Sequence, residues 1–365
     1  MIMEKDVYEK LRELLDLHPF GCPPAPEIIE VLKILFTEAE AKVALGLAFR
    51  PFTVEEIACR AGVDTQEAGE RLESLADKGL VFARQKKEVW GYALFDILRI
   101  LENPLRKLIP DETKNKSIPF LKNYVPTLNQ SFNSPTSYLR VIPIQEKIET
   151  APGILFHDKL YDLIDRAKVV GIARCACREL EQKCDGPREA CMVFDETCTF
   201  LVNRGFARYL TKEEMKKKAR EFNKAGLVLQ VNNTRDRLDI VCNCCSCCCG
   251  FLRAVREFGN PRAITRSPFI PVWEMEHCDG CGICAGERCP MKAIGMVEGK
   301  PVWQFDRCIG CGLCATGCPN GAIHLKREAE IPEPPANIME MGMQMLQARG
   351  KFQAFLEIMT PTTTP

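Results

Sequence analysis

The distribution of cysteine is the feature that most constrains this chain. The sequence holds 21 cysteines in 365 residues, and all except Cys22 and Cys59 lie between Cys175 and Cys318. A secreted chain would use thiols at this density for disulfides, whereas a chain in a reducing compartment keeps them reduced. Reduced thiols at short spacings are typical of metal or iron–sulfur ligands. We therefore expect metal sites, and not a disulfide framework, to organise the second half of the fold.

Composition and charge exclude several other classes of protein. The chain carries 49 basic and 49 acidic residues, and this balance argues against a basic nucleic-acid or membrane-surface binder. The sequence contains no run of about 18 apolar residues, so no membrane span is predicted. Its first residues are charged and amphipathic and lack the apolar core of a signal peptide. We therefore expect a cytoplasmic protein.

Residues 1–103 alternate helical patterns with turns and then give two short strands around a charged turn. Thr53 and Glu56 form a predicted capping box at the start of one of these helices. The order of helices and hairpin resembles a winged helix-turn-helix domain. Its second HTH helix, residues 64–78, carries five acidic and two basic side chains. Phosphates would repel such a helix, so we do not expect nucleic acid as a partner.

The rest of the chain predicts an α+β multidomain protein. Residues 104–155 hold several prolines and few clean periods, which indicates a linker. Residues 156–272 alternate strands with helices and carry cysteines at the ends of strands, which predicts a small Cys-rich α/β domain. Residues 328–365 predict a proline-rich tail followed by one Met-rich amphipathic helix, which is expected to serve as a packing or docking face.

An internal repeat occupies residues 278–323, as "CDGCGICAGERCPMKAI" and "CIGCGLCATGCPNGAI". Each half has three cysteines separated by two residues and then a fourth cysteine followed by proline. The glycines between the cysteines leave backbone amides close to the sulfurs, and the apolar residues that follow give cover against water. The first half has one extra residue before its fourth cysteine, which we expect to be a local change of the loop.

This repeat resembles the bacterial two-cluster ferredoxin over residues 273–327. The resemblance implies two [4Fe–4S] clusters, because the fourth cysteine of each half ligates the other cluster in that family. Carried over, the ligands of cluster 1 are Cys278, Cys281, Cys284 and Cys318. Those of cluster 2 are Cys308, Cys311, Cys314 and Cys289. A pair of four-cysteine zinc sites is the alternative, but zinc would need neither the Cys-Pro step nor the twofold arrangement.

A second set of cysteines lies upstream of the repeat, and we expect at least one further iron–sulfur cluster among them. The candidate ligands are Cys175, Cys177, Cys184, Cys191, Cys242, Cys244, Cys245, Cys248 and Cys249. Three of them, Cys242, Cys245 and Cys248, repeat the ferredoxin spacing. Adjacent residues of an extended chain face opposite sides, so two sites, or one site with spare thiols, are expected. Zinc and a metal-free redox dithiol are the alternatives, and it stays open whether Cys184 and Cys191 serve one site.

The steps "CACR", "CDGP" and "VCNCCSCCCG" extend the resemblance further. Together with the ferredoxin repeat they resemble a family of multidomain 4Fe–4S proteins of anaerobic microbes, over residues 26–325. Cys198 and Cys247 are extras relative to that family's pattern, so we do not expect them to be ligands. The resemblance implies an architecture more than an activity.

One-electron transfer is the function that these features predict. The expected partner is a soluble redox protein or an oxidoreductase subunit, and the residues leave open whether the chain is itself an enzyme. Two rivals remain: a regulator in which iron–sulfur clusters switch the winged helix, and a reductase with an active-site cluster in residues 175–249. The sequence shows no phosphate-binding loop and no catalytic triad, so no catalytic residue is named.

Overall fold

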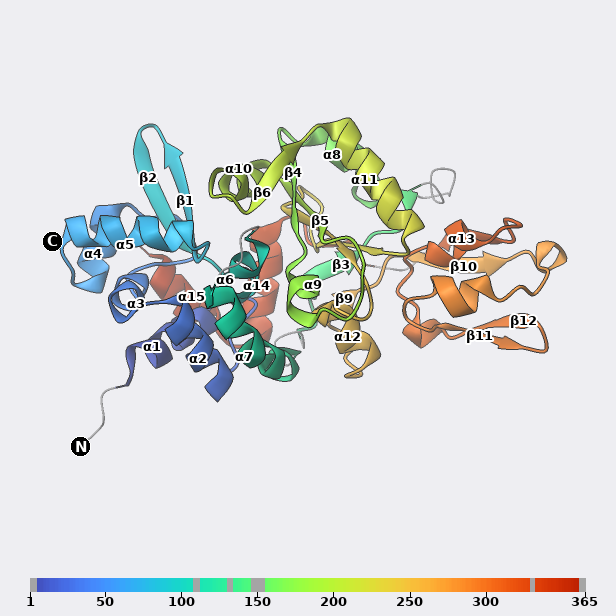
Figure 1. Ribbon diagram of the computed structural model, residues 1–365, viewed down its shortest axis with the longest axis horizontal. Coiled ribbons are helices and arrows are strands. Elements are labelled where there is room, and N and C mark those ends of the chain that lie inside the picture. Colours follow the sequence, from blue (N-terminus) through green and yellow to red (C-terminus); the bar gives the residue numbers. More distant parts are fainter. Residues whose placement is uncertain (1–4, 108–111, 130–133, 146–154, 329–331, 361–365) are drawn as a thin grey trace.

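The computed structural model describes residues 5–107, 112–129, 134–145, 155–328 and 332–360. Figure 1 shows an N-terminal helical unit, a central sheet unit and the cysteine repeat following one another along the long axis of the molecule. The mixture of helices and strands agrees with the predicted α+β class. Among the helices of the described residues, none has both the length and the apolar composition that a membrane span requires.

The N-terminal unit forms the predicted helices and hairpin. Its elements are α1 (Val7–Asp16), α2 (Pro26–Leu35), α3 (Glu38–Ala44), α4 (Val54–Ala61), α5 (Thr65–Asp77), β1 (Val81–Lys86) and β2 (Val89–Leu94). The capping box of Thr53 and Glu56 starts α4, and the left-handed Gly62 ends it. The antiparallel pair β1–β2 turns at Lys87 and Glu88, which both have positive φ.

Helix α5 and the hairpin face the central unit. Arg204 donates a hydrogen bond to Glu73 at 3.0 Å and another to Asp77 at 2.5 Å. On the hairpin, Arg84 pairs with Glu196 at 3.1 Å. Two acidic groups of the predicted second HTH helix therefore bind a cation of the same chain.

Residues 104–155 are not a simple linker in their described part, which corrects the prediction from sequence. Helix α6 (Ile97–Arg106) is followed by α7 (Glu112–Leu128) and by β3 (Leu139–Val141), which joins the central sheet. Prolines 119 and 126 lie inside α7. The helix persists because Leu121, Tyr124 and Leu128, at helical spacing, are buried against the core.

The central unit is a seven-stranded sheet in the order β6-β4-β5-β8-β7-β3-β9. Its further strands are β4 (Val170–Arg174), β5 (Glu189–Phe194), β6 (Ala207–Leu210), β7 (Val228–Asn232), β8 (Ile240–Cys244) and β9 (Ile264–Thr265). Its helices are α8 (Leu160–Arg166), α9 (Ala176–Glu181), α10 (Asp195–Asn203), α11 (Lys212–Lys224) and α12 (Gly250–Arg256). Strand β8 lies in the middle, antiparallel to both neighbours, and places Cys242 opposite Cys191.

The cysteine repeat and its flanking strands fold into two antiparallel pairs connected by short helical segments. Strand β10 (Phe269–Trp273) pairs with β13 (Ile323–Arg327), and β11 (Ile294–Val297) pairs with β12 (Lys300–Trp303). The unit thus begins at Phe269, slightly before the expected boundary at residue 273. The second half uses the α-helix α13 (Leu313–Gly317), whereas the first half uses a π-helix, Cys284–Arg288. The extra residue of the first half is therefore absorbed by a wider helical turn.

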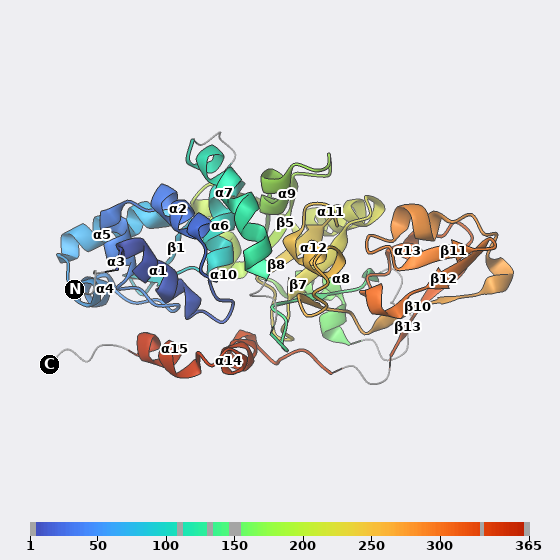
Figure 2. The same cartoon turned by 90° about the horizontal axis from the view of Figure 1, so that it is seen from below.

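The C-terminal segment is two helices and not the single helix that the sequence predicted. Helix α14 (Ile338–Ala348) and α15 (Phe352–Met359) are separated at Gly350, whose φ is +65°. A glycine in this left-handed region ends a helix, which explains the break. Figure 2 shows both helices running along the N-terminal unit. Arg349 fixes them there by donating to Asp16 at 2.7 Å and to the carbonyl of His18 at 2.6 Å.

We expect Arg349→Ala to loosen this docking, because it removes charge-assisted hydrogen bonds that are only partly exposed. The loss should be about 2 kcal/mol of unfolding free energy, with faster proteolysis of α14 and α15. Lys351→Ala is the matched control, since Lys351 is more exposed and lies 3.3 Å from the same carboxylate. Equal effects of the two variants in urea unfolding would contradict the assignment.

Candidate metal centres

The eight cysteines of the repeat line two separate cavities, four to each. One cavity is bordered by Cys278, Cys281, Cys284 and Cys318. The other is bordered by Cys289, Cys308, Cys311 and Cys314. In both sets the fourth cysteine comes from the opposite half of the repeat, because the antiparallel pairs bring the two halves face to face. Four thiols around one enclosed space form a donor set that suits a [4Fe–4S] cluster.

Backbone amides point at the sulfurs of these two sets. The N–H of Ala293 donates to the sulfur of Cys289 at 3.1 Å, and the N–H groups of Gly310 and Leu313 donate to Cys308 and Cys311. Gly310 allows this approach because its φ is +68°, and a Cβ there would lie 2.4 Å from the carbonyl oxygen of Phe269. The loop around the second cavity therefore depends on glycine.

The two cavities differ in their exposure to water. Cys281, on the first cavity, is exposed, whereas Cys314, on the second, is buried. Burial raises the pKa of Cys311 to about 12. The N–H of Ile144 donates to the carbonyl of Cys311 at 3.2 Å, and Arg288 donates to two carbonyls at the end of α11. The second cavity is thus covered by the central unit, and the first faces outward.

Six further thiols of the central unit are neighbours of one another in a closed ring. The ring runs, in order, through Cys175, Cys177, Cys249, Cys244, Cys242 and Cys191, and returns to Cys175. We call this group the six-thiol ring. Four of its members line a cavity together with Arg99, Tyr138 and Asp239. The two that are only half-buried, Cys177 and Cys242, both border that cavity.

The positions of the ring cysteines follow from the alternation of side chains along the strands and from the starts of two helices. Cys242 and Cys244 stand two residues apart on β8 and so point to the same face of the sheet. Cys191 lies opposite Cys242 on β5. Cys175 precedes the first residue of α9, and Cys249 precedes that of α12.

Buried cations compensate the negative charge that this ring would carry as thiolates. Hydrogen bonds donated by Cys175 and Cys242 hold the pKa of Cys191 well below its usual value, and the charge of Arg106 adds to this effect. Arg106 is 1% exposed and is paired with Glu102 at 2.7 Å. Arg178, the arginine of "CACR", is fully buried and faces Cys175 and Cys244.

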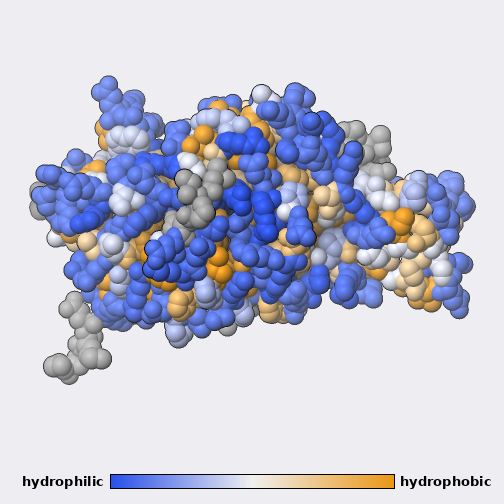
Figure 3. Space-filling model, in the orientation of Figure 1, coloured by the Kyte–Doolittle hydropathy of each residue, from blue (hydrophilic) through white to orange (hydrophobic). Residues whose placement is uncertain are grey.

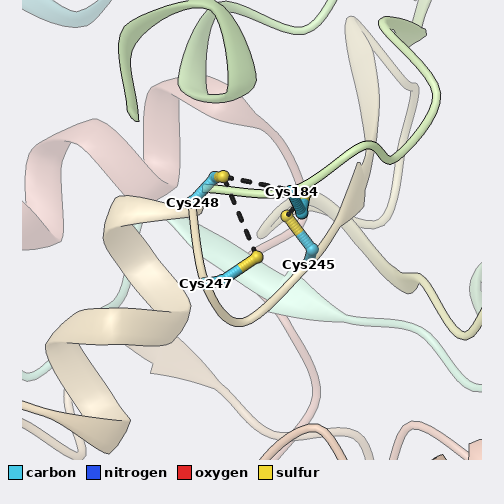
Figure 4. A group of neighbouring side chains, drawn as sticks. All are labelled: Cys184, Cys245, Cys247 and Cys248. Atoms are coloured by element: carbon cyan, nitrogen blue, oxygen red, sulfur yellow. Dashed lines mark hydrogen bonds between the residues drawn. The ribbon is translucent and has the colours of Figure 1, made fainter. Parts of the chain in front are cut away.

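A third group consists of Cys184, Cys245, Cys247 and Cys248, and we call it the four-thiol group. Its four sulfur atoms all lie within 4.8 Å of one another. Figure 4 shows the side chains converging from two loops, one that follows α9 and one between β8 and α12. The sulfur of Cys184 lies 3.7 Å from that of Cys245 and 3.9 Å from that of Cys248. Cys247 and Cys248 are 3.8 Å apart.

The structure rearranges the upstream set that the sequence predicted. The ferredoxin-spaced triple is divided, because Cys242 belongs to the six-thiol ring while Cys245 and Cys248 belong to the four-thiol group. Cys184 and Cys191 also belong to different groups. Cys247, which was not expected to be a ligand, is a full member of the four-thiol group. Adjacent residues of a strand face opposite sides, and this alternation was the sequence signal that could have separated the two groups. The sequence does not show where β8 ends, so the alternation could not assign each cysteine.

The remaining cysteines stand apart from these groups. Cys198 is buried on α10, where burial raises its pKa to about 11. Cys22 is buried in the N-terminal unit beside Tyr124, and Cys59 is exposed on α4. All 21 cysteines are free thiols in the structure.

One comparison with known proteins bears on these sites. Residues 301–324 match the family model of the 4Fe-4S binding domain. The matched segment carries Cys308, Cys311, Cys314 and Cys318, and so draws on both cavities of the repeat. The chain therefore contains a ferredoxin-type iron–sulfur domain with at least one 4Fe–4S cluster. Comparison with curated proteins and with solved structures finds no match.

We expect Gly310→Ala to lower the iron content, because the new methyl group would collide with the backbone of Phe269 and push the loop away from the second cavity. Gly286→Ala is the matched control in the other half, since a Cβ there meets open space. Iron and acid-labile sulfide per chain are the measurements. Unchanged iron in Gly310→Ala would show that the loop tolerates the side chain and contradict the prediction.

Proposed function

We propose that this protein transfers single electrons, holding two [4Fe–4S] clusters in residues 269–327 and a further polynuclear iron–sulfur cluster at the six-thiol ring. The observation that carries the proposal is that eight cysteines line two cavities, four to each, and that the fourth cysteine of each set comes from the other half of the repeat. Such clusters supply one-electron redox chemistry, and their surroundings set the potential. The ligands of the first two are the quartets Cys278, Cys281, Cys284, Cys318 and Cys308, Cys311, Cys314, Cys289.

The residues around the two quartets have distinct tasks in this proposal. Amide donors such as Ala293 and Gly310 favour the thiolate form of the ligands and stabilise added negative charge. The outward cavity gives access to a redox partner. Exposed apolar side chains occur on the same unit, and these are Met275, Val297, Val302 and Phe305. Figure 3 shows apolar surface on this end of the molecule, which suits transient docking of a soluble redox protein.

The six-thiol ring holds more thiols than a single metal ion binds. One tetrahedral metal takes four thiolates, so six converging thiols favour a cluster of several metal ions. Arg106 and Arg178 supply positive charge beside it, without which a buried anionic group of this kind would be strongly unfavourable. The inward quartet is covered by the same central unit, which suits passage of electrons between the two.

A reductase is the second candidate, and one observation favours it. The cavity on the six-thiol ring is also lined by Arg99, Tyr138 and Asp239, which could orient a small polar substrate. A change in the EPR spectrum of the reduced protein on addition of a substrate would support this candidate.

For residues 1–103 we propose a winged-helix-like docking domain and not a DNA reader. Glu73 and Asp77 of α5 already bind Arg204, and the hairpin residue Arg84 already binds Glu196. These contacts tie both DNA-facing elements to the central unit, which counts against a regulator that binds DNA.

Iron analysis tests the proposal. The protein isolated without oxygen should hold about eight iron atoms in the repeat, four in each [4Fe–4S] cluster, and additional iron at the ring. Cys249→Ser should lose the additional iron and keep the eight. Cys198→Ser is the control, since Cys198 is buried but stands outside the three groups. A parent protein with only about eight iron atoms would refute the cluster at the ring, and one with about four would refute the pair in the repeat.

A further inference from the structure

We infer that the four-thiol group is a structural zinc site, separate from every iron site of the chain. The inference does not depend on the proposed electron transfer, because it concerns different residues and a metal without redox chemistry. Its ligands would be Cys184, Cys245, Cys247 and Cys248. The cysteines of residues 242–249 would then serve two kinds of metal centre.

The spacing of the sulfur atoms carries the inference. Zinc binds thiolates at about 2.3 Å in a tetrahedron, so its four sulfur ligands lie about 3.8 Å apart. Three of the sulfur–sulfur separations in the four-thiol group are 3.7, 3.8 and 3.9 Å, and the other pairs of sulfurs lie within 4.8 Å of each other. A [4Fe–4S] cluster attaches each thiolate to its own iron atom, which holds the sulfurs farther apart than the ligands of a single ion.

The ligand pattern is that of a structural zinc site. Cys245 and Cys248 are separated by two residues, within the spacing range of such sites, and Cys184 and Cys247 complete a set of four thiolates. A single iron ion would have similar geometry, and metal analysis of the protein distinguishes the two. Four protein ligands leave no open coordination position, which is the mark of a structural site. Such a site needs no redox function.

The surroundings of the group suit a bound anionic zinc–thiolate centre. Backbone N–H groups of Lys183 and Gly186 donate to the sulfurs of Cys248 and Cys184. The charge of Arg178 acts on Cys245 of the four-thiol group as well as on Cys175 and Cys244 of the six-thiol ring, so this buried cation serves both groups. Amide donors and a nearby cation are the outer contacts that stabilise thiolate ligands.

The position of the group indicates what the zinc would do. It would join the loop after α9 to the loop that follows β8, and each loop adjoins ligands of the six-thiol ring. The ion pair of Glu181 with Arg253, at 2.6 Å, joins α9 to α12, the helices that adjoin these two loops. Zinc would therefore hold Cys244 and Cys249 in place for the ring.

The test measures zinc and iron together in the full chain purified without oxygen. We expect about one zinc atom per chain, with a zinc-edge X-ray absorption spectrum of four sulfur neighbours at about 2.3 Å. Cys247→Ser and Cys184→Ser should each lose the zinc, while the control Cys59→Ser keeps it. The iron of the ferredoxin repeat should be unchanged in all three, so that loss of zinc cannot be mistaken for failure of the iron sites.

Three results would overturn the inference. They are a parent protein that holds no zinc, a zinc spectrum without four sulfur neighbours, and a Cys247→Ser variant that loses iron and keeps its zinc. If both cysteine variants fail to fold, the absorption spectrum of the parent still decides. Zinc in sulfur-only coordination supports the site, and an iron ion in four-thiolate coordination refutes it.

Discussion

The direction in which each cysteine of residues 242–249 points is the constraint on which the rest of the structure depends. On β8, Cys242 and Cys244 share one face and reach the six-thiol ring. The strand then ends, and the residues that follow bring Cys245, Cys247 and Cys248 together with Cys184. Cys249 returns to the ring at the start of α12. One segment thereby supplies three thiols to each of two centres.

Charge decides whether two such centres can lie so close together. Several thiolates in a dry interior repel one another and lose hydration, so they require fixed cations. Arg178 supplies this positive charge to both groups, since it faces Cys175 and Cys244 of the ring and Cys245 of the four-thiol group. Arg106 does the same for Cys191 and Cys242 of the ring. The arginine of the "CACR" step is thus as much a part of the site as its cysteines.

Sequence reasoning was strongest where a local pattern also fixes the contacts across the fold. The repeat at 278–323 encodes its own twofold arrangement, so the expected quartets are the ones that line the two cavities. Prediction from the sequence was weakest where packing between distant segments decides the structure. Proline-bearing α7 and the short β3 are stabilised by burial against other elements, which a proline-rich stretch does not reveal. Likewise Cys247 joins Cys184 only because the sheet brings two distant loops together.

Anomalous X-ray diffraction above the iron and zinc absorption edges tests the division of the cysteines most directly. We predict iron in both cavities of the repeat and within the six-thiol ring. We also predict zinc, without iron, among Cys184, Cys245, Cys247 and Cys248. Iron at the four-thiol group, or a ring without metal in the protein isolated under exclusion of oxygen, would contradict it.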